Sequence, residues 1–419
     1  KLCRIAFTGG GTGGHVYPAL AVWERLRELI PPDVNLEVLW IGSRNGIEKD
    51  ILIPYLQPSK EGSMEGSVEG SVEQRGLDYY GVSCGKLRRY FSLRNFSDLF
   101  RIAWGIAQSY QILRRKRPDL LFSKGGFVSV PAVIAAKILG IPVWAHESDL
   151  DPGLATRLVL PWVHKLFLPY EQSRKYYPSR FQGKLEVCGN PVRQEFFCHF
   201  YKQDRLCEEN TPPFAECGLL PPRWFDTSGG LKKPLLLVLG GSLGAHELNM
   251  YVAEWLKSKG LGPFYILHQC GSEDYRDLCG DFATGGGELE QNETADYRVL
   301  PFIPRGLGKV YQLCRQSGGL VVSRAGAGSL WEILASGNRA ILVPLQSGSR
   351  GDQVRNARFF AEQGWGDCFI VERTAGNQGN SQKLLEKICL ILQDRELYLG
   401  KDIPDAALLI ARKMWAQVR

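Results

Sequence analysis

A run of glycines near the start of the chain restricts the possible folds more than any other feature. Residues 1–14 read KLCRIAFTGGGTGG, so the glycines directly follow a short apolar run. Apolar side chains then repeat at helical spacing over Pro18–Leu29. The pattern predicts a buried strand, a glycine turn and an amphipathic helix. Glycine lets a ligand approach the backbone closely, and the free N–H groups at the helix start favour an anion.

The same pattern returns in the second half of the chain, where the apolar run Leu235–Leu239 leads into Gly240–Ala245 and another helix. Two such units, in a chain of 419 residues that is 44% hydrophobic, predict two α/β domains, each with its own core. The expected strands are 2–7, 36–41, 119–123, 141–145 and 185–187 in the first domain, and 235–239, 264–268, 298–300, 319–322, 340–343 and 368–371 in the second. Residues 59–76, with repeated EGS, and 201–233 are expected to be insertions, and 405–419 a helix.

Composition narrows the class of protein. The net charge of +7 permits an anionic partner without requiring nucleic acid. Eleven cysteines without a C-x-x-C pair favour reduced thiols in a cytosolic protein. No apolar stretch of about 20 residues occurs, so no transmembrane helix is expected. No spacing of His and carboxylate residues indicates a metal site, and we expect no metal and no cofactor.

The glycine loops differ in the ligand that they suit. Gly9, Gly11 and Gly14 satisfy G-x-G-x-x-G, but an NAD site also needs an acidic residue at the end of the second strand. That strand ends in Gly42-Ser43-Arg44, which disfavours a dehydrogenase. The second loop suits a diphosphate, because Ser242 adds a hydroxyl donor to the N–H groups of the helix start.

Two ionisable residues beside glycine loops have more than one interpretation. His15 follows the first loop, where it could cap the helix or act as a base opposite a nucleotide sugar. Glu332 follows a third glycine loop, Gly326–Gly328, where it could cap a helix or accept the two hydroxyls of a ribose.

Residues 84–117 mix aromatic and basic side chains. This segment is either a helix with one packed face or a surface that inserts aromatic side chains into a bilayer and pairs arginines with anionic headgroups. The residues expected to contact the membrane are Arg88, Arg89, Phe91, Arg94 and Phe96.

The motifs together resemble those of the MurG family, which transfers N-acetylglucosamine (GlcNAc) from UDP-GlcNAc to lipid I in peptidoglycan synthesis. The similarity rests on segments that span nearly the whole chain. They are Gly10–Pro18 (GGTGGHVYP), Gly125–Ser129 (GGFVS), His146-Glu147, Gly189–Arg193 (GNPVR), Gly240–Ala245 (GGSLGA), Arg324–Glu332, Asp352-Gln353 and Asn356-Ala357.

The resemblance implies an α/β protein of the GT-B fold, with two Rossmann-like doubly wound domains, a deep cleft between them and a C-terminal helix that returns to the first. The implied domains are 1–192 for the acceptor and the membrane, 193–397 for UDP-GlcNAc, and 398–419 for the tail helix. Carried over from the family, Ser242 and Arg193 contact the diphosphate, Ile303 the uracil, Glu332 the ribose, and Gln353 the sugar. Ala327, Gly328, Ser329 and Leu330 contact the phosphates, and Thr12, Gly13, Gly14 and His15 approach from the acceptor side.

The chain departs from the family in several places. His146-Glu147-Ser148-Asp149 stands where members often have HEQN, Asp352 stands where a Gln is common, and the EGS insertion and the long linker fall outside the usual pattern. Asp149 thus replaces an Asn that contacts the sugar.

The implied reaction is an inverting transfer to the C4 hydroxyl of the muramoyl sugar, with His15 as the base and Glu147 as the weaker alternative. The expected partners are UDP-GlcNAc, lipid I and an anionic membrane surface, with no nucleic acid. The expected location is the cytoplasmic face of the bacterial inner membrane, as a peripheral protein. A transferase that uses a diacylglycerol acceptor and an inactive nucleotide-sugar-binding protein are the alternatives.

Overall fold

The chain forms two compact units, which are described separately. Unit 1 consists of Lys1–Arg193 with Pro404–Arg419, and unit 2 of Gln194–Ile403. The computed structural model describes residues 2–56, 76–85, 93–197, 219–241, 244–258, 263–282, 293–294, 296–303, 306–346, 351–372, 376–393 and 403–419. Most of each of the two expected insertions lies outside these ranges.

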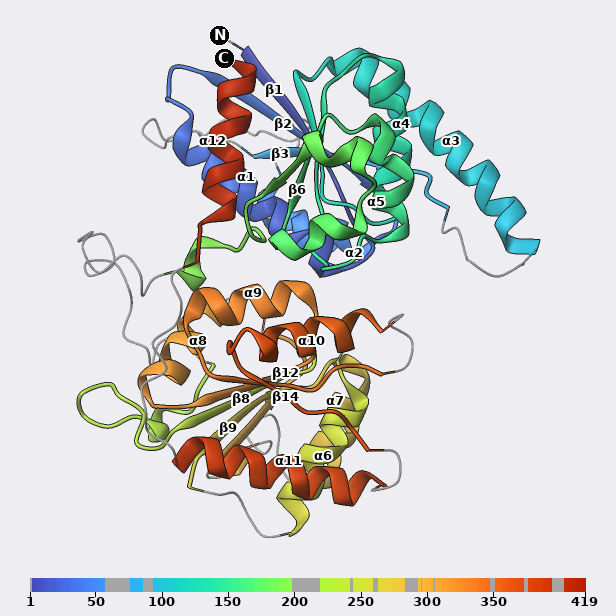
Figure 1. Cartoon of the computed structure of the whole chain (residues 1–419). Coiled ribbons are helices and arrows are strands. Elements are labelled where there is room, and N and C mark those ends of the chain that lie inside the picture. Colours follow the sequence, from blue (N-terminus) through green and yellow to red (C-terminus); the bar gives the residue numbers. More distant parts are fainter. Residues whose placement is uncertain are drawn as a thin grey trace. The chain divides into compact units, whose positions relative to one another are not determined.

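Unit 1 is built on a parallel sheet with the strand order β3-β2-β1-β4-β5-β6-β7 (Figure 1). The strands are β1 (Leu2–Thr8), β2 (Asn35–Ser43), β3 (Leu77–Val82), β4 (Leu120–Ser123), β5 (Val143–His146), β6 (Lys165–Leu168) and β7 (Leu185–Val187). The helices are α1 (Tyr17–Leu29), α2 (Ile47–Leu52), α3 (Leu93–Lys116), α4 (Ser129–Ile138), α5 (Leu154–Val159) and α12 (Ala406–Val418). The strand order reverses between β1 and β4, and in open α/β sheets ligands bind at such a point, beyond the carboxyl ends of the strands.

Alternate side chains along each strand belong to two separate hydrophobic cores, one on each face of this sheet. On β1, Ile5 and Phe7 point toward α1 and α12, whereas Ala6 points toward α4 and α5. This is the period of two that a pleated strand imposes. Both faces of a parallel sheet are covered in this way, which explains why its strands are almost continuously apolar.

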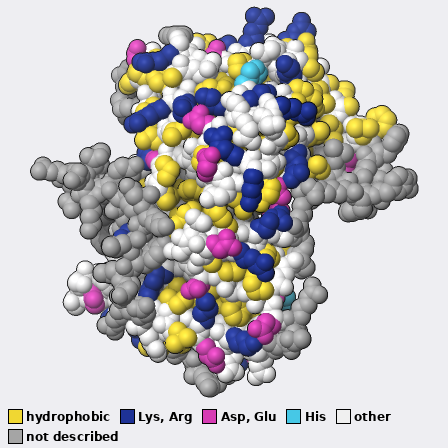
Figure 2. All heavy atoms as spheres, in the orientation of Figure 1, with side chains coloured by type: hydrophobic (Ala, Val, Ile, Leu, Met, Phe, Trp, Pro, Cys, Tyr) yellow, Lys and Arg dark blue, Asp and Glu magenta, His cyan; other side chains and the backbone are white. Residues whose placement is uncertain are grey.

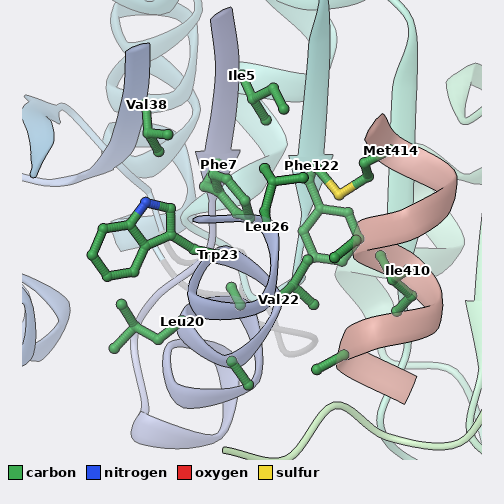
Figure 3. Packing of buried hydrophobic residues seen from close by; sticks show 14 of the residues in the cluster. Ile5, Phe7, Leu20, Val22, Trp23, Leu26, Val38, Phe122, Ile410 and Met414 are labelled. Atoms are coloured by element: carbon green, nitrogen blue, oxygen red, sulfur yellow. The ribbon is translucent and has the colours of Figure 1, made fainter. Parts of the chain in front are cut away.

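The C-terminal helix α12 completes the first of these cores (Figure 3). Ile410 and Met414 pack with Val22, Leu26 and other side chains of α1 over the sheet. Two buried charged side chains add to this contact. The guanidinium of Arg25 on α1 donates to the carboxylate of Asp405 at 2.7 Å, and Asp405 also accepts from the backbone N–H of Leu408 as the N-cap of α12.

Unit 2 repeats the architecture with the strand order β10-β11-β9-β8-β12-β13-β14. Its strands are β8 (Leu235–Leu239), β9 (Tyr265–Gln269), β10 (Glu293–Thr294), β11 (Tyr297–Leu300), β12 (Leu320–Ser323), β13 (Ala340–Leu342) and β14 (Asp367–Cys368), of which β10 is antiparallel. Its helices are α6 (His246–Ser258), α7 (Ser272–Phe282), α8 (Leu307–Gln316), α9 (Ala327–Ser336), α10 (Asp352–Glu362) and α11 (Gly376–Gln393). Here the order reverses between β8 and β12, so the loops after these strands occupy the ligand-binding position.

The expectation of an α/β protein with two doubly wound domains is confirmed, although three strands were not expected, β3, β6 and the two-residue antiparallel strand β10. β3 is an edge strand whose LDYYGV sequence is only partly buried, and β6 has only four residues. None of the three has a run that is long and apolar enough to stand out as a strand.

Candidate active site

The first glycine loop lies at the reversal point of unit 1, where it adopts a conformation that requires glycine. Gly11 has a φ of +85°. A Cβ atom at Gly10 would lie 2.5 Å from the carboxyl carbon of Glu48, so there is no room for a side chain at position 10.

Glu48 itself is a buried carboxylate that fixes the loop. Its Oε2 accepts from the N–H of Gly11 at 3.0 Å. Its Oε1 accepts from both the N–H and the hydroxyl of Ser43, at 2.7 and 2.5 Å. Sequence reasoning missed this role, because a glutamate on the short helix α2 carries no local signal of a contact 37 residues away.

His15 lies directly behind the loop, and the structure excludes one of its two interpretations. The N-cap of α1 is Val16, and no side chain caps that helix, so His15 is not a helix cap. Its Nδ1 atom is buried and has no hydrogen-bond partner within the described part of the chain. A Cβ atom at Gly126, where φ is +78°, would lie 3.0 Å from the ring, so the pair Gly125-Gly126 packs directly against the imidazole.

The surroundings of His15 favour its neutral form. Burial, followed by the positive charge of Lys124, lowers its pKa to about 4, against smaller opposing effects of Glu147, the Lys124 backbone and Glu48. At neutral pH the ring is therefore uncharged. A neutral imidazole has one nitrogen that can accept a proton.

Glu147 is placed less favourably for proton transfer. Its carboxylate accepts hydrogen bonds from three backbone N–H groups, those of Ser148 at 2.8 Å, Asp149 at 3.2 Å and Gly153 at 3.1 Å. These bonds fix the turn between β5 and α5, so the carboxylate is already engaged by three backbone donors. Glu147 therefore has a structural role that the sequence did not reveal.

The other predicted residues of unit 1 lie around this point. Thr12 and Gly14 are exposed and Gly13 is buried, all between β1 and α1. Asp149 is half-buried in the turn that Glu147 fixes. Arg193 belongs to unit 1, and its guanidinium lies over the ring of Tyr17, 4.8 Å from the centroid.

In unit 2, a glutamine connects two of the predicted segments. Gln269, the last residue of β9, donates to the carbonyl of Gly241 at 3.0 Å and accepts from the N–H of Ile303 at 3.1 Å. The N–H of Ile303 is thus already bonded. Ser242 lies outside the described residues.

The start of α9 presents N–H groups to an open space. Its N-cap is Gly326, which has no side chain to accept from the first turn, and a Cβ atom at Gly326 or Gly328 would meet no atom within 4 Å. Ala327, Gly328, Ser329 and Leu330 form this first turn. Such an end attracts anions because of its free donors and the helix dipole.

Glu332 lies one turn further along α9 and is half-buried. It is the sixth residue of a helix whose N-cap is Gly326, so it is too far along to cap the helix. Helix capping is therefore excluded, and contact with a ribose stays a prediction.

Three side chains from other elements fix the loops around α9. Arg324 donates to Glu247 on α6 and to the carbonyl of Val343. Asn356 on α10 donates to the carbonyl of Ala325. Gln353, also on α10, accepts from the N–H of Leu345 at 2.9 Å, so its carbonyl oxygen is occupied. These contacts join residues far apart in the sequence, so the sequence motifs did not indicate them.

The predicted membrane residues are only partly covered by the structure. Arg88, Arg89 and Phe91 lie outside the described residues, and Arg94 and Phe96 belong to α3 but their side chains are not described. Among the described helices, none combines the length and the apolar composition needed to span a bilayer. Within the same ranges, no group of three or more His, Cys, Asp or Glu side chains could hold a metal ion.

Comparison with protein families matches both units. Residues 5–55 and 62–168 match the N-terminal domain of glycosyltransferase family 28, and residues 235–399 match its C-terminal domain.

Two relatives with high coverage have the same name, UDP-N-acetylglucosamine–N-acetylmuramyl-(pentapeptide) pyrophosphoryl-undecaprenol N-acetylglucosamine transferase. The protein of Treponema pallidum is 38% identical over 89% of this chain and 84% of its own. That of Borreliella burgdorferi is 32% identical over 94% of this chain and 89% of its own.

Solved structures show the same fold at lower identity. MurG of Acinetobacter baumannii is similar with a TM-score of 0.62 at 21% identity, over 99% of both chains. A UDP-GlcNAc 2-epimerase of Neisseria meningitidis reaches 0.60 at 13% identity, over 99% of this chain and 100% of its own. With its two doubly wound units of the GT-B fold, the chain belongs to glycosyltransferase family 28 and, within it, to the MurG family of N-acetylglucosaminyltransferases.

Proposed function

We propose that this protein transfers GlcNAc from UDP-GlcNAc to the C4 hydroxyl of the muramoyl sugar of lipid I, with inversion, to give the β-1,4-linked lipid II. The observation that carries the proposal is His15 behind a glycine loop at the reversal point of unit 1, with its Nδ1 buried and without a hydrogen-bond partner among the described residues. In unit 2, we assign the donor substrate to the open start of α9. The names of the T. pallidum and B. burgdorferi relatives support the choice of substrates.

In the proposed reaction, the imidazole of His15 accepts the proton of the C4 hydroxyl. The hydroxyl oxygen attacks the anomeric carbon of GlcNAc from the face opposite to UDP, the bond from that carbon to the diphosphate oxygen breaks, and UDP leaves. Glu147 is the second candidate for the base, but it would have to leave its three backbone partners. Thr12, Gly13 and Gly14 carry the acceptor side of the site.

The donor would bind to unit 2. Ala327, Gly328 and Ser329 present the first-turn N–H groups of α9 to the diphosphate, where preorganised donors stabilise the charge that develops on the leaving group. Leu330 completes this turn, since its own N–H donates to the carbonyl of Gly326 at 3.1 Å. We assign further diphosphate contacts to Ser242 and Arg193.

The remaining contacts to UDP-GlcNAc follow from the hydrogen bonds that these residues already make within the protein. Glu332 would accept the ribose hydroxyls. Because the N–H of Ile303 is bonded to Gln269, Ile303 would contact the uracil through its carbonyl. Gln353 would donate to the sugar through its amide NH₂, since its carbonyl oxygen holds Leu345. Asp149 would contact the sugar from unit 1.

Release of UDP from UDP-GlcNAc, measured with lipid I, with diacylglycerol and with no acceptor, tests this function. We expect turnover with lipid I alone. Turnover with diacylglycerol would indicate the related transferase, and binding of UDP-GlcNAc without turnover on either acceptor would indicate a binding protein. The variant His15→Ala should lower the rate by about 10²–10⁴-fold while UDP-GlcNAc still binds. Near-normal turnover of that variant would move the base elsewhere, with Glu147 the next residue to test.

We also propose that unit 1 docks on an anionic membrane surface through α3, on the cytoplasmic face of the bacterial inner membrane. Leu99, Phe100 and Trp104 on this helix are 57%, 64% and 61% exposed, next to the exposed Arg101. Figure 2 shows hydrophobic side chains on the right of unit 1, the side on which Figure 1 draws α3. Inserted aromatic side chains would bury apolar area, and each nearby basic residue adds about 1 kcal/mol at an anionic leaflet.

Sedimentation with vesicles that contain an anionic lipid tests the docking surface. The double variant Phe100→Ser/Trp104→Ser should lose binding to the vesicles but keep its activity on a soluble, short-chain acceptor. Leu390→Ser is the matched control, because Leu390 is 67% exposed on α11 of unit 2. If the double variant sediments as the unmodified protein does, the membrane contact lies elsewhere. Charge reversal at Arg88, Arg89 and Arg94, the basic residues that the sequence predicts to contact the membrane, should likewise abolish sedimentation with the vesicles.

A further inference from the structure

Lys124 is a buried cation that the proposed reaction does not use. It directly follows β4, and its side chain is 1% exposed. Its backbone N–H donates to the carbonyl of Thr8 at the end of β1, at 2.8 Å, so it lies at the reversal point of the sheet. A Cβ atom at Gly9 would lie 3.1 Å from the Cβ of Lys124, which places the first glycine loop directly against this residue.

A chain of hydrogen bonds holds the ammonium group in place. Nζ of Lys124 donates to the hydroxyl of Ser148 at 2.5 Å, and that hydroxyl donates to Oδ1 of Asn190 at 2.8 Å. All three side chains are buried. They come from the ends of β4, β5 and β7, so the chain of bonds spans four strands of the sheet beneath the candidate site.

The charges around Lys124 indicate why a buried amine remains protonated. Burial lowers its pKa to about 8, and the neighbouring carboxylates of Glu147 and Asp149, with a smaller contribution from Cys188, oppose that change. At pH 7 the side chain is therefore mainly an ammonium ion. A buried charge is costly unless it is paired or hydrogen-bonded, and here the two carboxylates and Ser148 offset that cost.

The same ammonium acts on His15. The backbone of residues 124–126 lies against the imidazole, and a Cβ atom at Gly125 would be 3.8 Å from its Nδ1. The charged groups that face His15 are Lys124, which disfavours the imidazolium, and Glu147 and Glu48, which favour it. Of these charges, Lys124 has the largest effect.

We propose that Lys124 is a positioning residue for the transfer reaction, whose buried ammonium, held by Ser148 and Asn190 beside the first glycine loop, adds to burial in disfavouring the imidazolium form of His15. The proposal rests on the proposed function in one respect, the assignment of His15 as the base.

Two variants separate the charge of Lys124 from its hydrogen bond. Lys124→Met removes the charge and keeps the length of the side chain, whereas Ser148→Ala removes the hydrogen bond and keeps the charge. We expect Lys124→Met to move the acidic limb of the pH profile of kcat/KM upward by about one pH unit or more. Ser148→Ala should leave the position of that limb unchanged, whatever its effect on the rate.

NMR titration of His15, with histidine labelled at Cε1, gives a readout that does not need activity. The imidazole pKa should rise in Lys124→Met and stay unchanged in Ser148→Ala. In the unmodified protein, the deprotonation of Lys124 near pH 8 should produce a second inflection in the His15 signal, a test that does not depend on how the variants fold.

The outcomes distinguish this proposal from the proposed function. If His15 titrates alike in Lys124→Met and the unmodified protein, and no second inflection occurs, Lys124 only fills space and the proposal is overturned. If the titration of His15 moves as expected but His15→Ala retains turnover, the coupling stands and the assignment of the base is wrong.

Discussion

The attachment of α12 to unit 1 can be tested at a single residue, because the carboxylate of Asp405 makes two separate contacts. One oxygen accepts from the N–H of Leu408 at 2.9 Å as the N-cap, and the other accepts from Arg25 at 2.7 Å. The side chains of Arg25 and Asp405 are only 8% and 9% exposed, so their interaction is poorly screened by solvent. Arg25 keeps a second partner, Glu28, whose side chain is 50% exposed.

The two contacts determine how strongly Asp405→Ala should destabilise the docked α12. Loss of an N-cap costs about 0.5–2 kcal/mol, and loss of a hydrogen bond between charged groups about 1.5–3 kcal/mol. Because Arg25 retains Glu28, we expect Asp405→Ala to destabilise the docked α12 by about 2–4 kcal/mol. Since about 1.4 kcal/mol corresponds to a factor of ten, this is a rise of about 30-fold to 1000-fold in the opening equilibrium.

Hydrogen exchange, followed by mass spectrometry over residues 406–418, measures that equilibrium directly. Asp405→Asn is the matched variant, because its amide oxygen can still cap the helix while the charge is lost, so its exchange should lie between that of Asp405→Ala and that of the unmodified protein. Peptides from α9 in unit 2 serve as the internal control and should be unaffected. Unchanged exchange of α12 in Asp405→Ala would refute the reasoning, and equally faster exchange in α9 would show a global rather than a local effect.

Three further predictions concern the two candidate sites and the stability of unit 2. Glu332→Ala should weaken UDP-GlcNAc binding by about tenfold to a hundredfold, the loss of about 1.5–3 kcal/mol in charged hydrogen bonds; unchanged affinity in calorimetry would contradict the assignment. Glu48→Gln should lower kcat/KM about tenfold or more, because an amide NH₂ must then face the N–H of Gly11 or of Ser43; steady-state kinetics with full activity would show that the loop does not need the carboxylate. Burial lowers the pKa of His268 to about 3, so between about pH 6.5 and 3 the unfolded state binds more protons and the free energy of unfolding falls as the pH falls. For His268→Gln, the free energy of unfolding, measured in urea at pH 4, 5 and 6, should depend less steeply on pH, by up to one proton. An unaltered pH dependence would exclude His268 as the cause.

Local patterns predicted the fold well where sequence neighbours decide the structure. The apolar run before the first glycines became β1, and the helical spacing over 18–29 became α1. Both depend on contacts within a few residues and on burial. The edge strand β3 and the four-residue strand β6 were missed, because their strand conformation depends on pairing with β2 and β5 rather than on their own composition.

The candidate site was predictable only in part, for the same physical reason. His15 and the start of α9 are adjacent to glycine loops, which mark them in the sequence. Glu48 and Gln269 have no such mark, since each acts on a loop that lies far away in the chain. Lys124 does precede a glycine pair, but its bond to Ser148 joins residues that are 24 positions apart. A lysine beside a glycine pair usually indicates a solvated surface residue, and only the folded sheet buries it.

The return of the chain into unit 1 also has a consequence for the order of folding during synthesis. Residues 404–419 are made after all of unit 2, and the core side chains Ile410 and Met414 are among them. Unit 2 is continuous in sequence, so all of it has been synthesised before unit 1 has its complete set of core residues. A nascent chain therefore carries an uncovered apolar face on α1 for as long as the ribosome takes to make unit 2, and a chain that stops before residue 404 never covers it.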